Sequence, residues 1–266
     1  MATVQVVTGT KLGPIQSVFA RPVEVCSHTN QIIELVRLLY APKQLDIVDT
    51  ALEVVEPDQG DAPSPDLKMA SASYQGDDKI VIAVNLAMGD EVADLNIALQ
   101  GACLTLPAAH GLPRLVPAPQ PQHFVEEDKE IAHGVYNLLT TIGAVKDVAR
   151  AMPHRIRTRE DKIVASLLGM AHEISATDVR EGRMGSLFHV GQFAEVVTWG
   201  TAEQVARYYE DVARVYHPST MTLLDMAKAA FAHDILGVDG FRAACEEMFR
   251  GFGVTGWTLA NRGLLV

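Results

Sequence analysis

Residues 106–122 read LPAAHGLPRLVPAPQPQ, with prolines at positions 107, 113, 117, 119 and 121. Proline lacks a backbone N–H and fixes φ, so this density of prolines excludes a continuous helix or a central strand. The composition is typical of an extended connector between domains. We therefore predict one domain at residues 1–105, a Pro-rich linker at 106–122 and a second domain at 123–266; an arm that reaches a neighbouring subunit is the alternative.

The residues before this linker favour strands. Short apolar runs rich in β-branched side chains lie between turn residues, at positions 4–7, 45–55 and 79–84. One helix is predicted at residues 30–39, where apolar side chains recur three and four positions apart and Pro42 follows. The N-terminal domain is thus predicted to be mixed β/α.

After the linker the apolar period becomes helical. One apolar face recurs in each of five segments, at residues 125–149, 159–174, 201–216, 221–236 and 241–252. Thr201 and Gln204 have the spacing of a capping box, which predicts a helix start. The fold class is therefore predicted to be α+β, with a strand-leaning N-terminal part followed by an all-helical C-terminal bundle.

Composition indicates a folded protein and limits the cellular compartments in which we expect it. Apolar residues make up 48% and charged residues 21%, as in folded globular proteins. Residues 79–88 are the densest apolar segment, shorter than the roughly 18 residues of a membrane span, and the first residues lack the pattern of a secretory signal. The three cysteines, at 26, 103 and 245, form no CxxC pair. We therefore predict a cytoplasmic protein with no membrane partner.

The distribution of charge is uneven on a chain of net charge −11. Residues 1–125 hold 7 Lys/Arg against 14 Asp/Glu, whereas residues 126–266 hold 15 against 19. A binding surface for phosphate requires positive charge at the contact itself. One short stretch supplies it, with Arg150, His154, Arg155, Arg157, Arg159 and Lys162.

We call these residues the basic island. Its RIRTR segment, residues 155–159, precedes a predicted helix, so three guanidiniums are expected near a helix start, where backbone amides also favour anions. The alternative is a surface cluster paired with neighbouring carboxylates such as Glu160 and Asp161.

Common catalytic motifs for nucleotides, metalloprotease zinc or a nucleophilic serine do not occur in the sequence. Glu130 and His133 have an ExxH spacing that places both on one helix face, and His172 and Glu173 are adjacent. Together with His189 they suggest an alternative function, a metal-dependent or acid/base enzyme with its site in the helical domain. No cofactor is predicted, and an enzyme is not the favoured interpretation.

Residues 201–253 resemble the end of the helical core in coat proteins of flexuous filamentous plant viruses, most nearly the potyvirus type. The segments that carry the resemblance are TAEQ at 201–204, VARVY at 212–216, LDMAKAAF at 224–231 and FRAACEEM at 241–248. Two positions depart from the family pattern. Glu203 replaces an arginine and Ala232 an aspartate, so the ion pair of the family cannot form here.

The resemblance implies a helical core that holds single-stranded RNA in a groove, with arms that link subunits into a filament. It predicts a structural RNA-packaging coat protein that self-associates, located in the cytoplasm or in a virion. A non-catalytic scaffold with an acidic partner surface is a third hypothesis. The predicted RNA-binding residues are Arg150, Arg155, Arg157, Arg159, Lys162, Arg207 and Lys228.

Overall fold

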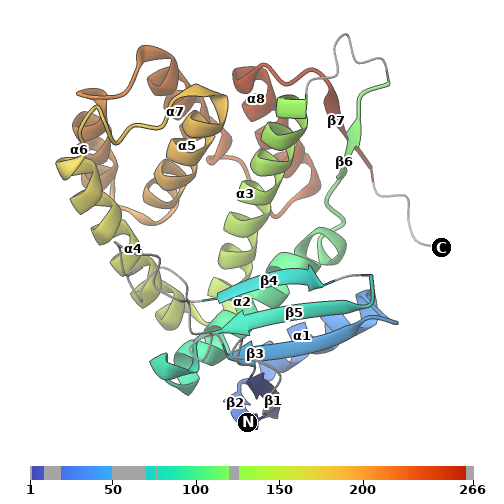
Figure 1. The fold of residues 1–266 in the computed structure, drawn as a ribbon. Helices are drawn as coiled ribbons and strands as arrows, with labels where there is room; N and C mark the ends of the chain where they lie inside the picture. The colour runs from blue at the N-terminus through green and yellow to red at the C-terminus, as the bar shows by residue number, and fades with distance from the viewer. Residues whose placement is uncertain (1, 9–18, 50–69, 76, 120–125, 262–266) are drawn as a thin grey trace. The chain divides into compact units, whose positions relative to one another are not determined.

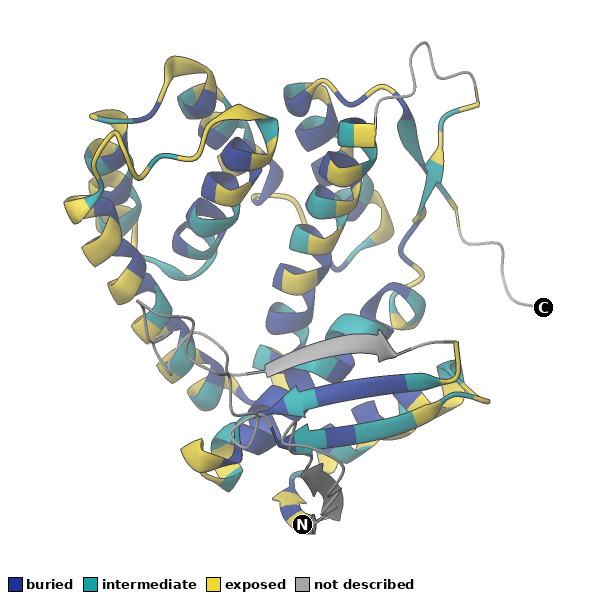
Figure 2. Cartoon of the chain, viewed as in Figure 1, coloured by how far each residue is buried: buried dark blue, intermediate teal, exposed yellow. Residues whose placement is uncertain are grey.

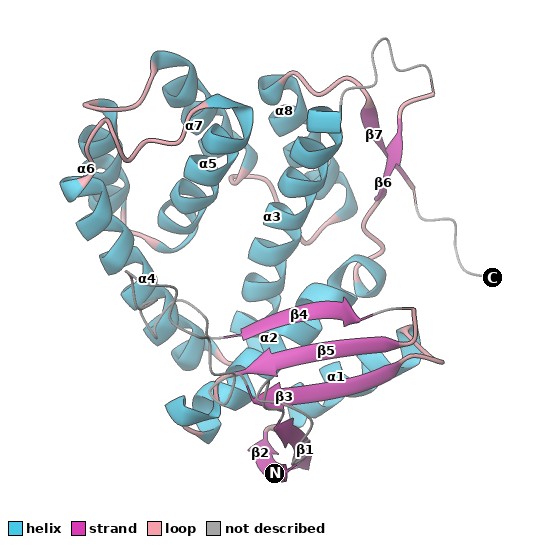
Figure 3. Cartoon of the chain, viewed as in Figure 1, coloured by secondary structure: helices cyan, strands magenta, loops and turns pink. Residues whose placement is uncertain are grey.

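The computed structural model describes residues 2–8, 19–49, 70–75, 77–119 and 126–261. It divides into an N-terminal unit, Met1–Thr105, and a C-terminal unit, Leu106–Val266. The N-terminal unit contains all five strands of the larger sheet, and the C-terminal unit is dominated by helices (Figure 3). The predicted α+β class is therefore confirmed.

The N-terminal unit is a mixed sheet with two helices (Figure 1). Its strand order is β2-β1-β3-β5-β4, in which β1–β3 and β3–β5 are parallel and both edge pairs are antiparallel. Alternate residues of the central strands, such as Ile47 and Ile82, form one buried cluster with Ile33 of α1 and Ile97 of α2. The elements are β1 Ala2–Thr8, β2 Phe19–Val25, α1 Ser27–Leu39, β3 Gln44–Asp49, β4 Ala70–Gln75, β5 Lys79–Val84 and α2 Asp90–Ala109.

Most of the predicted elements of this unit are confirmed, but α2 was not foreseen. Strands occur at 4–7, 45–49 and 79–84, and a helix covers 30–39; residues 50–55 lie outside the described residues. Helix α2 is buried continuously from Ala93 to Leu99, so it shows no amphipathic period. Among the described residues it is the one helix with the length and hydropathy of a membrane span, and 67% of that span is buried inside the protein.

The prediction of an extended linker at residues 106–122 is wrong for residues 106–117. Helix α2 continues through Pro107, and β6 Arg114–Pro117 pairs with β7 Trp257–Ala260. Leu106 is 1% and Leu112 0% exposed, and each buried leucine stabilises the fold by about 2 kcal/mol. This burial offsets the one amide hydrogen bond that Pro107 cannot donate. The small β6–β7 sheet also shows that the C-terminal part is not entirely helical.

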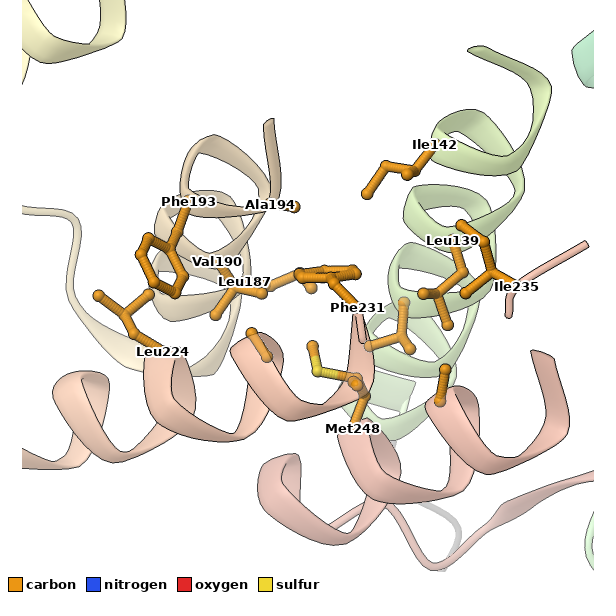
Figure 4. Close-up of a cluster of buried hydrophobic side chains, with 14 of the residues drawn as sticks. Leu139, Ile142, Leu187, Val190, Phe193, Ala194, Leu224, Phe231, Ile235 and Met248 are labelled. Carbon is orange, nitrogen blue, oxygen red and sulfur yellow. The ribbon is translucent and has the colours of Figure 1, made fainter. Parts of the chain in front are cut away.

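The C-terminal unit is built around α3, which packs against α4, α5 and α8. Its helices bury the faces that they turn towards one another (Figure 2). Figure 4 shows the Phe231 ring between Leu139 of α3 and Leu187 of α5. The helices are α3 Glu126–Ala151, α4 Pro153–Glu173, α5 Gly182–Trp199, α6 Ala202–Ala213, α7 Pro218–Ala230 and α8 Val238–Phe252.

All five predicted helices exist, with boundaries that differ by up to six residues. Helix α4 begins at Pro153, six residues before the predicted start at 159, and α7 ends at Ala230 rather than 236. Helix α5 was not predicted. Eight of its residues are buried and it packs against α3, α4, α6 and α7, so it has no continuous polar face.

The predicted capping box at the start of α6 is confirmed. The Gln204 amide donates to Thr201 Oγ1 at 3.2 Å, and the Thr201 amide donates to Gln204 Oε1 at 2.8 Å. Thr201→Ala is therefore expected to lower the free energy of unfolding by about 1 kcal/mol, measured by urea denaturation. Thr222→Ala is the control, since that exposed hydroxyl bonds only the Pro218 carbonyl within its own helix; equal losses in both variants would contradict the prediction.

Candidate nucleic-acid interface

The basic island lies inside helix α4 and not on an extended segment before it, apart from Arg150, which is in the last turn of α3. Because α4 begins at Pro153, residues 155–159 occupy its first two turns. Arg155 and Arg159 are one turn apart on the same face, whereas Arg157 is rotated by about 200° from Arg155. The three guanidiniums therefore lie near a helix start, as expected, but they do not share one face of the helix.

Arg157 and Arg150 keep their guanidiniums in solvent. The Arg157 side chain is 56% exposed; its Nε lies 2.8 Å from Asp161 Oδ1 and its Nη1 donates to the Trp199 carbonyl at 3.4 Å. Arg150, 65% exposed, lies 3.9 Å from an Asp147 oxygen. Each of these two ion pairs joins exposed side chains of the same helix, and each stabilises the fold by about 0.5 kcal/mol. Lys162 is also exposed, one turn beyond Arg157.

Arg159 has a different environment, because its guanidinium contacts a buried carboxylate. The Arg159 side chain is 25% exposed and donates through Nη1 to Oε1 of Glu160, which is fully buried. Glu160 in turn hydrogen-bonds Glu195 of α5, which joins the two helices. Arg159 therefore balances a buried charge instead of facing solvent. Arg155, on the same face of α4, is also partly buried.

The two glutamates share a proton. Burial raises the pKa of Glu160, and burial together with the negative charge of Glu160 raises the pKa of Glu195 to about 7. Below about pH 7 the Glu195 carboxyl is protonated and donates to Glu160, because two ionised groups in contact repel strongly. The sequence contained no sign of this pair, since Glu160 and Glu195 are 35 positions apart.

A second cationic cluster lies on α6, which packs against α4. Asp211 accepts from Arg214 Nη2 at 2.9 Å, and Arg207 Nε lies 4.0 Å from its other oxygen. The His172 ring of α4 is 3.5 Å from Asp211, and Arg214 also donates to the His172 carbonyl at 3.3 Å. Two exposed guanidiniums thus share one carboxylate, on a helix that also carries the exposed Glu203 and Glu210. Sequence reasoning included Arg207 but missed Arg214, although a seven-residue spacing places both on one helix face.

Lys228 lies apart from these clusters in the fold. It is exposed in the last turn of α7, a helix that packs against α5 and α8. The island and the Asp211 cluster, by contrast, belong to α4 and α6. The candidate interface therefore consists of exposed cations at the α3–α4 junction and along α4 and α6, namely Arg150, Arg157, Lys162, Arg207 and Arg214.

The alternative metal ligands are not brought together. Glu130 and His133 are exposed on the first turns of α3, where the His133 ring meets the edge of Trp257 at 5.1 Å between centroids. His172 pairs with Asp211, and Glu173 is exposed. Across the part of the chain that the structure describes, no three His, Cys, Asp or Glu side chains are placed to hold a metal ion.

Comparisons of the chain with models of protein families, with curated proteins and with solved structures found no match.

Proposed function

We propose that the protein is a structural coat protein that packages single-stranded RNA and self-associates into filamentous particles. In this proposal the phosphates contact Arg150, Arg157, Lys162, Arg207 and Arg214. Arg155, Arg159 and Lys228, which the sequence also suggested, are left out because they are partly buried or lie on another helix. The resemblance of residues 201–253 to filamentous coat proteins supports self-association.

One observation carries the proposal, namely that positive charge is concentrated on an exposed surface of a chain with net charge −11. Residues 150–162 hold five Lys/Arg and two Asp/Glu, and one of those carboxylates, Glu160, is buried and neutralised by Arg159. Phosphates therefore meet excess positive charge here, whereas the acidic remainder of the surface repels RNA.

The ion pairs on this surface are weak enough to be exchanged. The pair of Arg157 with Asp161 is about half exposed on both sides, and such pairs contribute little because water competes for both groups. A phosphate offers the guanidinium a charge-assisted, bidentate contact that a flexible exposed carboxylate does not hold as well. Exchange of partner therefore requires no change in the packing of α4.

RNA binding is expected to weaken steeply with salt. Five phosphate contacts on a single strand predict a slope of log affinity against log salt of about −3.5, and removal of Arg157 and Lys162 together reduces the slope to about −2. The measurement is fluorescence anisotropy of a labelled oligouridylate of about 20 nucleotides between roughly 50 and 200 mM salt. Electron microscopy of the mixture tests the second part of the proposal, with filaments as the expected result.

The matched control is the double variant Lys129→Ala/Arg250→Ala, which removes the same two residue types from α3 and α8. Its slope is expected to equal that of the unmodified protein. A similar loss in both double variants, or no binding of RNA by the unmodified protein at the lowest salt, would rule out this interface. Compact single particles in the presence of bound RNA would rule out filament formation while leaving RNA binding intact.

A further inference from the structure

A cavity of about 450 Å³ lies between α4, α5 and the end of α6. This volume is in the range of pockets for small organic molecules. Its walls are largely apolar, with Leu167, Ala171 and Ile174 on one side and Phe188 on the other. A small set of buried polar groups lies among them.

These polar groups form a chain of hydrogen bonds centred on Tyr216. His189 is 1% exposed, and its Nε2 accepts from the Arg180 amide at 3.1 Å. Its proton therefore lies on Nδ1, which donates to Tyr216 Oη at 2.8 Å. Burial lowers the pKa of His189, so the ring is neutral at neutral pH.

Tyr208 also hydrogen-bonds to Tyr216, and we assign the donor role in this pair to the Tyr208 hydroxyl. The Tyr216 oxygen thus accepts two hydrogen bonds, from Tyr208 and His189, and its own O–H is the remaining hydrogen-bonding position. Burial raises the pKa of Tyr216, so this group stays protonated. A molecule in the cavity meets a hydrogen-bond donor at the inner end.

The mouth of the cavity offers an exposed apolar surface and disfavours an anion. Phe188 is 40% and Met170 48% exposed, which is unusual for side chains of this size. The Arg180 guanidinium lies 3.7 Å from the centroid of the Phe188 ring, but the lining also includes the carboxylates of Glu173 and Asp178. Two negative groups against one positive group disfavour an anion.

We infer that this cavity binds a small neutral aromatic compound that carries a hydrogen-bond acceptor. The ring packs against Phe188, Leu167 and Ile174, and the acceptor oxygen takes the hydrogen bond of Tyr216. This binding function is separate from RNA packaging and does not depend on it.

Calorimetry of the full chain with three soluble probes tests the inference. Benzamide is neutral and carries a carbonyl acceptor, and benzoate is its anionic counterpart. Benzylamine is protonated at neutral pH and therefore offers no acceptor. We expect saturable one-to-one binding of benzamide, at least tenfold weaker binding of benzoate, and no measurable binding of benzylamine. Tyr216→Phe removes the donor and is expected to weaken benzamide binding about tenfold, the effect of one lost hydrogen bond.

Tyr209→Phe is the matched control, because Tyr209 lies on α6 near Phe193 but does not line the cavity. It is expected to bind benzamide like the unmodified protein. If Tyr216→Phe does not fold, as judged by circular dichroism, the exposed mouth residue provides a second variant, and Phe188→Ala is expected to weaken binding at least fivefold. No saturable binding of benzamide at millimolar concentration, equal affinity of all three probes, or unchanged affinity in both cavity variants would overturn the inference.

Discussion

Glu195→Gln is expected to stabilise the protein by an amount that grows by about 3 kcal/mol between about pH 4 and about pH 8. The expectation rests on the pKa of Glu195, which burial and the charge of Glu160 raise from 4.5 to about 7 in the folded protein. Glutamine provides an N–H donor to Glu160, as protonated Glu195 does, but it never ionises. The variant therefore avoids the penalty of a second buried negative charge.

The direction of the pH dependence follows from the sign of the shift. A carboxyl whose pKa is raised on folding contributes its stability fully below the unfolded value of 4.5 and loses it as the pH rises through about 7. The charged groups that act on Glu195 are Glu160 and Arg159 of α4, and Asp161 adds a repulsion to Glu160. The unmodified protein is therefore expected to lose stability over this range, and the variant to lose much less.

Urea denaturation across this pH range measures the difference. Glu203→Gln provides the control, because Glu203 is exposed on the first turn of α6 and the same chemical change there alters no buried charge. Glu203→Gln is expected to change the free energy of unfolding by no more than about 0.5 kcal/mol at every pH. A difference between Glu195→Gln and the unmodified protein that is constant with pH would show that the two carboxyls do not share a proton.

Arg183→Met is expected to lower the free energy of unfolding by about 3 kcal/mol. Arg183, at the start of α5, donates from Nη1 to Asp128 Oδ1 of α3 at 2.6 Å. Its Nε and Nη2 donate to the Phe252 carbonyl at the end of α8, at 3.1 and 2.8 Å. One side chain thus joins three helices, and its removal leaves a carboxylate that is 5% exposed without its cation.

The loss of stability in Arg183→Met is also expected to depend on pH. Burial opposes ionisation of Asp128, but hydrogen bonds from Arg183 and the Thr255 amide outweigh it and lower the pKa of that carboxyl. A group whose pKa is lowered on folding contributes stability above its unfolded value, here 3.8, and loses it as the pH falls. The difference between Arg183→Met and the unmodified protein is therefore expected to shrink below about pH 4.

Arg180→Met is the matched control for this variant. Arg180 is an exposed arginine three positions earlier, and its guanidinium stacks on the Phe188 ring. Loss of such a contact lowers stability by about 0.5–1 kcal/mol. Denaturation of both variants near neutral pH compares them, and equal losses would show that the bridge between α3, α5 and α8 is not what stabilises the unit.

Local patterns in the sequence were sufficient for elements with one buried and one polar face. Helices α3, α6 and α8 were predicted because their apolar residues repeat at the helical period, and strand β5 because it is a short apolar run rich in β-branched side chains. The capping box at Thr201 was also predictable, because all of its atoms lie within four consecutive residues. The basic island was also visible as composition, although its conformation was not.

The amino-acid sequence by itself therefore determined the α+β class, the amphipathic elements and the presence of a cluster of arginines. Tertiary packing decided the rest. Helices α2 and α5 are buried on several sides and carry no period. Leu106 and Leu112 anchor the segment that joins the end of α2 to β6 in the core, despite its prolines. Arg157 faces solvent, whereas Arg159 balances the buried charge of Glu160. Glu160 is hydrogen-bonded to Glu195, which lies on another helix. Such pairings join residues far apart in the chain, and only the packing of the helices brings them within the few ångströms over which hydrogen bonds and charge interactions act.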